Sequence, residues 1–220
     1  CKSCGFFAPE AALRPCHALA NMIYYIAKLS RFGRKHPLER KEVIVSEQEL
    51  ARQKEFTRKI REMNDRRTRT PLALVDTFGC QQNVADGEVL MGMLREMGYE
   101  LTRDENQADV ILLNTCAIRE HAEKRVYGHL GRLSHTKAAK PDQIICLCGC
   151  MAQQQVVADK LKNSYHHVDL VLGPQAEWRL PELLHEVYTK NKRVFSIENE
   201  HGRIAEDLPI VREGGVRAWV

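Results

Sequence analysis

The sequence predicts an α/β domain built on a doubly wound, mostly parallel sheet with flanking helices, preceded by a helical extension at the N-terminus. From residue 71 onward, short apolar runs alternate with segments whose apolar residues recur at helical spacing. Continuous apolar strands are typical of parallel sheets, because helices cover both faces of such a sheet. A chain of 220 residues has room for one core of ordinary domain size and a smaller attachment.

The N-terminal extension, residues 1–70, is charged and helical in pattern. Its clearest helix signal is Ser46 followed by Glu49, the spacing of a capping box, at the head of a helix-period segment. Basic residues outnumber acidic ones over 31–71, and such a run either meets phosphate or covers a solvated helix face and linker. We therefore expect a helical, basic and partly disordered extension, followed by the α/β domain over 71–220.

The first two strand and helix pairs carry the clearest pattern in the α/β domain. An apolar run over 72–78 is followed by a helix expected over 84–98, which closes with a glycine of the kind that often ends helices. The run over 109–115 has four consecutive apolar residues at its centre, and the helix expected over 117–133 has its apolar residues near one face. These pairs indicate two consecutive βα units.

The alternation continues to the end of the chain. Strands are expected over 143–149, 168–173 and 193–197, and the helices between them over 153–163 and 177–190. The same pattern, repeated without long interruptions, favours one parallel sheet for the whole of this part.

Composition excludes several classes of protein. Hydrophobic residues at 44% and charged residues at 28% are ordinary globular values, and no apolar run approaches the roughly 18 residues that a bilayer span needs. The first residue is Cys1 rather than Met, and no secretory signal pattern follows it. We expect a soluble, cytoplasmic protein and a fragment of a longer chain. Eight cysteines without secretory marks then favour reduced thiols engaged in metal or redox chemistry.

Three cysteines follow three successive predicted strands. Cys80, Cys116 and Cys150 are separated by 36 and 34 residues, about one βα unit each. Ligands of parallel sheets collect beyond the carboxyl ends of the strands, so we expect the three thiols to converge there. Each is also expected near the start of a helix, whose dipole lowers thiol pKa, and Gly79 and Gly149 permit tight turns beside two of them.

The number of thiols indicates what they hold. A structural zinc site normally takes four protein ligands, and no fourth Cys or His stands at a comparable strand end. An iron-sulfur cubane takes one thiolate per iron, so three cysteines leave one iron open to an exogenous ligand. The sequence therefore favours a reactive 4Fe-4S cluster.

Two further cysteines lie close to Cys150. Strand alternation puts Cys146 and Cys148 on one face, so we expect them to pack under a helix while Cys150, beyond the Gly149 turn, faces the site. The alternative is a metal-free thiol-redox function for Cys146, Cys148 and Cys150.

A separate zinc site at the N-terminus stays open as a hypothesis. Its ligands would be Cys1, Cys4, Cys16 and His17, a CxxC followed by a CH pair. Adjacent Cys16 and His17 cannot both reach one ion comfortably, which counts against this site.

Polar residues flank the cysteine loops. Asn83 and Asn114 are expected in turn or cap roles. Asp86 and Glu88 are expected to stabilise the start of a helix, and their charge would also tune the potential of a nearby cluster.

Four motifs in the α/β part, "TFGCQQNVADGE", "ILLNTCAIREHAEKRVYGHLG", "CGCMAQ" and "RLPELL", together resemble the N-terminal domain of the methylthiotransferase family. The resemblance covers about residues 71–220, and is strongest to the branch that acts on isopentenylated tRNA adenosine. It implies that Cys80, Cys116 and Cys150 bind an auxiliary 4Fe-4S cluster.

The resemblance also implies an activity. Such enzymes add sulfur and then methyl at C2 of N6-isopentenyladenosine in the tRNA anticodon stem-loop. They use S-adenosylmethionine as methyl donor and radical source, and a second 4Fe-4S cluster makes the radical. The sequence does not indicate the sulfur donor. The CxxxCxxC motif of the radical cluster and a C-terminal RNA-binding module do not occur in these 220 residues, so this chain alone is expected to be inactive.

Other functions fit the same three cysteines. Related enzymes act on a different tRNA adenosine or on an aspartate of a ribosomal protein. A non-catalytic metal-binding interaction module is a further alternative.

Overall fold

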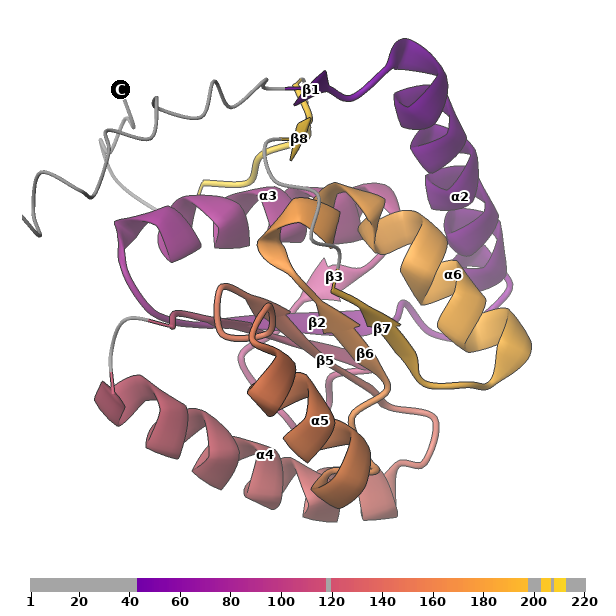
Figure 1. The fold of residues 1–220 in the computed structure, drawn as a ribbon. Helices are drawn as coiled ribbons and strands as arrows, with labels where there is room; N and C mark the ends of the chain where they lie inside the picture. Colours follow the sequence, from indigo (N-terminus) through magenta and orange to yellow (C-terminus); the bar gives the residue numbers. More distant parts are fainter. Residues whose placement is uncertain (1–42, 118–119, 198–202, 207, 213–220) are drawn as a thin grey trace, which may run out of the picture. The chain divides into compact units, whose positions relative to one another are not determined.

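The computed structural model describes residues 43–117, 120–197, 203–206 and 208–212 (Figure 1). Contacts divide the chain into two units, Cys1–Lys41 and Glu42–Val220, and the described residues all belong to the second. The suggested zinc ligands, Cys1, Cys4, Cys16 and His17, lie outside the described residues.

A six-stranded sheet forms the centre of the described unit, and all of its neighbouring strands are parallel. The strand order across the sheet is β3-β2-β4-β5-β6-β7. The strands are β2 (Leu72–Phe78), β3 (Glu100–Leu101), β4 (Val110–Thr115), β5 (Ile144–Gly149), β6 (Leu170–Leu172) and β7 (Val194–Ser196). The α/β prediction is confirmed, and the sequence missed only the two-residue β3 among these strands.

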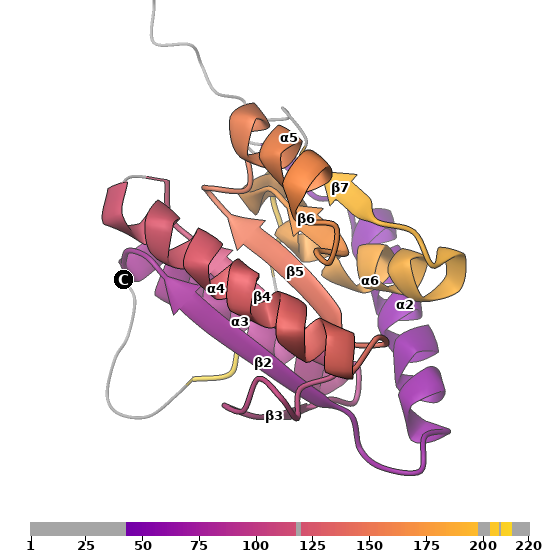
Figure 2. The ribbon, with the colours of Figure 1, turned by 90° about the horizontal axis from the view of Figure 1, so that it is seen from below.

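Helices cover both faces of the sheet (Figures 1 and 2). One face packs against α3 (Gln81–Glu96) and α6 (Leu180–Lys190), and the other against α4 (Glu120–Ala139) and α5 (Gln155–Ser164). A 3-10 helix, η1 (Pro174–Arg179), leads into α6, and β1 (Val43–Ile44) pairs with β8 (Arg203–Ile204) as a separate parallel ladder.

The core is split by the sheet into two apolar layers. Along β4, Val110 and Leu112 enter the layer under α3 and α6, whereas Ile111 and Leu113 enter the layer under α4 and α5. All residues of β4 and β5 are buried. Burial on both faces explains why these strands read as continuous apolar runs.

Helix α2 (Glu47–Asp65) begins as the sequence predicts. The Glu49 backbone N–H donates to Ser46 Oγ over 3.3 Å, and the Ser46 backbone N–H donates to Glu49 Oε2 over 3.1 Å, which completes a capping box.

The structure divides the chain earlier than the predicted boundary at residue 71. Helix α2 packs against α6, with Ile60 fully buried, and Gln53 Nε2 donates to Glu182 Oε2 over 3.0 Å. Asn64 Nδ2 also donates to the Met97 carbonyl over 2.9 Å. The helix is therefore part of the α/β unit, because a narrow buried stripe is enough to dock an otherwise charged helix.

In the part of the chain that the structure describes, no helix has both the length and the apolar character needed to cross a membrane.

Candidate metal centre

The adjacent strands β2 and β4 lead into helices on opposite faces of the sheet, α3 and α4 (Figures 1 and 2). In parallel sheets this arrangement opens a crevice at the carboxyl ends of the two strands, where ligands bind. Cys80 follows β2 and Cys116 follows β4 directly. The Cys116 backbone N–H donates to the Phe78 carbonyl over 3.0 Å, so the two cysteine loops meet at the carboxyl ends of these strands.

Cys80 is the N-cap residue of α3. The backbone N–H of Asn83 lowers the pKa of the Cys80 thiol, against the opposing effect of burial, and the Gln82 N–H and the Cys116 thiol lower it further. These are the effects expected at a helix N-terminus, where free N–H groups favour the thiolate. The lowered pKa of Cys80 favours the thiolate, the form of sulfur that binds metal.

The third thiol lies within electrostatic reach of the first two. Burial raises the pKa of the Cys150 thiol, and Cys116 and Cys80 both add to this increase. Cys116 is buried, Cys80 is half-buried and Cys150 is exposed. The structure thus brings the three predicted residues together at the carboxyl ends of β2, β4 and β5. The exposed Cys150 leaves one side of the group open to solvent.

The predicted helix effect on thiol pKa was wrong for Cys150. Its pKa is raised rather than lowered. Helix α5 begins only at Gln155, so a turn separates Cys150 from the free N–H groups of that helix. Burial and neighbouring negative groups then dominate.

A buried asparagine pair joins the first two cysteine loops. Asn83 Nδ2 donates to Asn114 Oδ1 over 2.9 Å, and Asn114 Nδ2 donates to the Asn83 carbonyl over 2.8 Å. Thr115 Oγ1 continues the connection to the Cys148 carbonyl on β5 over 2.8 Å. The cap role predicted for Asn83 is confirmed, because its Oδ1 accepts a hydrogen bond from the Cys80 backbone N–H over 3.3 Å. The sequence did not reveal that Asn83, on α3, and Asn114, on β4, also bind each other beside the first two cysteines.

Glycines allow the close approach of these loops. A Cβ at Gly79 would lie 2.9 Å from Cys116 Cβ, and a Cβ at Gly149 would lie 2.6 Å from Asn114 Oδ1. Gly149 also has a φ of +90°, in the left-handed region that favours glycine. Both glycines are required where the sequence predicted tight turns.

Cys146 and Cys148 pack in the core as predicted. Both are fully buried in the layer under α3 and α6, and Cys148 Sγ lies 3.6 Å from the Leu113 carbonyl oxygen. The neighbouring Cys146 thiol and burial raise the pKa of Cys148 well above its usual value. Their inaccessibility argues against a metal-free redox function for this pair.

Comparison with known proteins identifies relatives over this same segment. The model of "Uncharacterized protein family UPF0004" matches residues 73–173, which include all three cysteines. The chain is 44% identical over 186 residues to a tRNA-2-methylthio-N(6)-dimethylallyladenosine synthase of Acetivibrio thermocellus, covering 83% of this chain and 39% of that protein. Synthases of the same name from Staphylococcus saprophyticus and Staphylococcus aureus (strain JH9) are 47% and 45% identical over 147 and 162 residues, covering 67% and 74% of this chain.

The chain belongs to the methylthiotransferase family. The resemblance inferred from its motifs is thereby confirmed. The chain spans 39%, 29% and 31% of the length of these three relatives.

The donor chemistry of this methylthiotransferase segment suits a cluster better than a single ion. Among the described residues, no group of three or more His, Cys, Asp or Glu is arranged to bind one metal ion. A cubane takes one thiolate per iron, so its ligand sulfurs lie farther apart than the ligands of a single ion. Three thiols from three loops, one with a lowered pKa and one exposed, fit that requirement.

A carboxyl group that the sequence analysis missed lies beside the third cysteine loop. Glu177 of η1 accepts a hydrogen bond from the Gly149 backbone N–H. Burial raises the pKa of Glu177 to about 8, with a further contribution from Asp86 on α3. Glu177 comes after β6, the strand that pairs with β5. A search for metal ligands beyond each strand end located the cysteines, and it would also have located Glu177 if carboxylates had been included.

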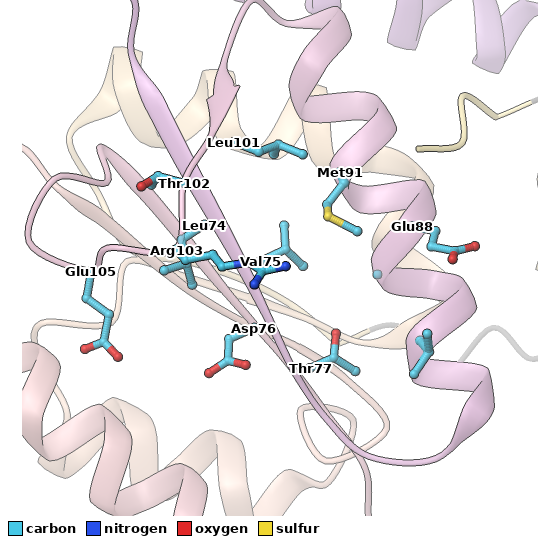
Figure 3. Close-up of a pocket in the computed structure, with 12 residues that line it drawn as sticks. Leu74, Val75, Asp76, Thr77, Glu88, Met91, Leu101, Thr102, Arg103 and Glu105 are labelled. Atoms are coloured by element: carbon cyan, nitrogen blue, oxygen red, sulfur yellow. The ribbon is translucent and has the colours of Figure 1, made fainter. Parts of the chain in front are cut away.

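A separate hollow of about 460 Å³ lies along the outer side of β2 (Figure 3). Thr77 lies on the side of α3, whereas Asp76 and Glu105 point to the other side of the strand. There, His129 of α4 has Nε2 2.7 Å from Glu105 Oε1 and Nδ1 3.6 Å from Asp76 Oδ2. No cysteine lines this hollow, so it is distinct from the three-thiol site in the methylthiotransferase segment.

Proposed function

We propose that this chain is the part of a tRNA methylthiotransferase that holds an auxiliary 4Fe-4S cluster on Cys80, Cys116 and Cys150. The observation that carries the proposal is that three thiols, from the carboxyl ends of the neighbouring strands β2, β4 and β5, interact with one another. The whole enzyme is proposed to add a methylthio group at C2 of N6-isopentenyladenosine next to the tRNA anticodon. The names of the related synthases support this choice of substrate.

The residues of this chain have separate tasks in the proposed site. Cys80 supplies a thiolate favoured by the start of α3, and Cys116 supplies a buried thiol hydrogen-bonded to it. The Asn83–Asn114 pair holds the two loops at a fixed distance, and Cys150 completes the set from the exposed side. When bound, the cluster supplies an open iron on which sulfur chemistry takes place.

The remaining cofactors belong to the proposed whole enzyme. S-adenosylmethionine and a second 4Fe-4S cluster would supply the methyl group and the radical, because an unactivated aromatic C–H is beyond acid–base groups alone. The anticodon stem-loop of tRNA is the proposed partner, which the formal charge of +4 suits.

Anaerobic reconstitution with iron and sulfide tests the cluster. Wild-type chain should bind about four iron and four sulfide per chain, the composition of a cubane. Alanine at Cys80, Cys116 or Cys150 should abolish this binding, whereas Cys146→Ala serves as the matched control and should retain it. Loss of the cluster in Cys148→Ala together with its retention in Cys150→Ala would contradict the ligand assignment.

Nucleoside analysis tests the substrate. The enzyme that contains this chain would be expressed in cells that lack tRNA methylthiolation, and digested tRNA would be measured by mass spectrometry. We expect 2-methylthio-N6-isopentenyladenosine to return. Methylthiolation of another tRNA adenosine, or of a ribosomal-protein aspartate, would instead support one of the alternative substrates.

A further inference from the structure

The fourth strand end of the βα series presents a carboxyl group. Strands β2, β4 and β5 lead to the three cysteines, and β6, which pairs with β5, leads through Gly173 into η1 and Glu177. Glu177 therefore occupies, at the next strand along the sheet, the kind of position that a fourth protein ligand would take.

One hydrogen bond and one unpaired oxygen of Glu177 bear on its place at the cysteine site. The Gly149 backbone N–H donates a hydrogen bond to its carboxyl group, and Gly149 directly precedes Cys150. Its Oε1 is sealed from solvent and has no hydrogen-bond partner among the described residues. Buried polar atoms in folded proteins nearly always have a partner, so an unpaired carboxyl oxygen beside a ligand site points to a group that binds there.

The surroundings of Glu177 favour its neutral form. Burial and the nearby carboxylate of Asp86 raise the pKa of Glu177 to about 8. Asp86 has a raised pKa itself, because it is partly buried, and its charge also acts on Cys150. A protonated carboxyl group donates one hydrogen bond, whereas a carboxylate only accepts.

We propose that Glu177 is a positioning residue for a sulfur ligand at the open corner of the cluster site, where its carboxyl group donates a hydrogen bond to a hydrosulfide ion. This inference rests on the proposed function. A thiolate at this strand end would bind the fourth iron of the cluster. A carboxyl group that donates a hydrogen bond would leave that iron free and still hold an anionic sulfur beside it. A neutral donor also avoids placing a second negative charge against the incoming ion.

The test measures binding of sulfide to the reconstituted chain, not catalysis. Wild type, E177Q, E177A and E177M would be loaded with iron and sulfide, assayed for iron, and titrated with sodium sulfide while the EPR spectrum of the reduced cluster is recorded. E177M fills the volume of the glutamate without a polar group, so it remains informative where alanine loosens the fold. E186Q, which neutralises a distant carboxylate on α6, is the matched control.

All variants are expected to keep the wild-type iron content. The sulfide concentration for half-saturation should rise roughly tenfold in E177A and E177M, as expected for loss of one hydrogen bond to a charged group. It should stay within about threefold of wild type in E177Q, whose amide N–H still donates, and be unchanged in E186Q.

Two results would overturn the inference. Wild-type sulfide binding in both E177A and E177M would show that Glu177 does not hold the sulfur, and loss of iron from both folded variants would make it a cluster ligand or a scaffold residue. A wild-type chain that binds no iron would remove the proposed function and this inference together. Normal iron content in E177A and E177M together with wild-type sulfide binding would contradict this inference and leave the proposed function standing.

Discussion

Asn83 on α3 and Asn114 on β4 hydrogen-bond each other, over 2.9 Å from side chain to side chain and 2.8 Å from side chain to backbone. Both residues are almost fully buried. Each asparagine therefore provides hydrogen-bond partners for polar groups of the other that water cannot reach. If the segments that carry Cys80 and Cys116 moved apart, these groups would lose their partners, which costs free energy.

Asn114→Ala tests this pair. The substitution removes both hydrogen bonds between Asn114 and Asn83, and leaves the Asn83 amide only its longer bond of 3.3 Å to the Thr115 carbonyl. The free energy of unfolding should therefore fall by about 1–3 kcal/mol. Urea denaturation measures the loss, and iron binding after reconstitution should weaken because the Cys80 loop is released. Asn106→Ala, at an exposed asparagine, is the control and should change stability by less than about 0.5 kcal/mol. Equal stability of the two variants would refute the linking role.

Gly149→Ala should damage the site through the backbone. An alanine there must adopt the left-handed φ of +90° and must also push against Asn114 Oδ1, at an expected cost of about 1–3 kcal/mol in unfolding free energy. Gly128→Ala provides an opposite control, since nothing lies within 4 Å of its added Cβ in the middle of α4. That variant should gain about 0.5–1 kcal/mol in thermal or urea unfolding. A Gly149→Ala protein as stable as wild type would contradict the predicted strain.

The metal-free chain should show a graded thiol reactivity. The pKa of Cys80 is lowered and that of Cys150 is raised, so the thiolate of Cys80 forms at lower pH. Alkylation by iodoacetamide, mapped by mass spectrometry between pH 6 and pH 10, should reach half its maximal rate at a lower pH for Cys80 than for Cys150. The buried Cys146 should remain unmodified while the protein is folded. A reversed order of Cys80 and Cys150 would refute the assigned electrostatics.

Asp109 should make stability depend on acid pH. Burial alone would raise the pKa of Asp109, but Lys140, the Leu72 backbone N–H and Arg69 outweigh it and lower the pKa. A carboxyl whose pKa is lower in the folded state stabilises the protein above its unfolded pKa of about 3.9 and loses that contribution as the pH falls through the folded value. Asp109→Asn should therefore be less stable than wild type at pH 7, and the gap in urea midpoint should shrink below about pH 4. A gap that is the same at both pH values would disprove this linkage.

The fold follows from the sequence where burial is continuous. Strands such as β4 and β5 are covered on both faces, so most of their residues are apolar and the strands could be recognised without the structure; Asn114 and Thr115, at the end of β4, are polar. Strand β3 escaped notice because two residues that pair only with the start of β2 leave no periodic pattern. Helix α2 was assigned to the extension because its composition is charged, although Ile60 and a few polar contacts are enough to dock it.

The cysteines of the candidate site could be predicted from the residues that come directly after each predicted strand. Cys80, Cys116 and Cys150 were predicted because a parallel sheet places equivalent loops side by side, and this depends on topology alone. The asparagine pair was not predicted, because it depends on which side chains of two loops face each other in three dimensions. Glu177 was missed because only Cys and His were considered at the fourth strand end, and its unusual pKa arises from burial that no local pattern reveals.

The three thiols come from separate βα units, and this determines the order of assembly. Cysteines 36 and 34 residues apart are close only after β2, β4 and β5 have paired, so an unfolded or half-formed sheet has no place for the cluster. The two apolar layers of the sheet do not include Cys80, Cys116 or Cys150, so the strands can pair without the proposed cluster. Under the proposed function, iron and sulfide would therefore be delivered to a folded sheet, and a carrier would contact the surface around the three strand ends rather than an extended chain.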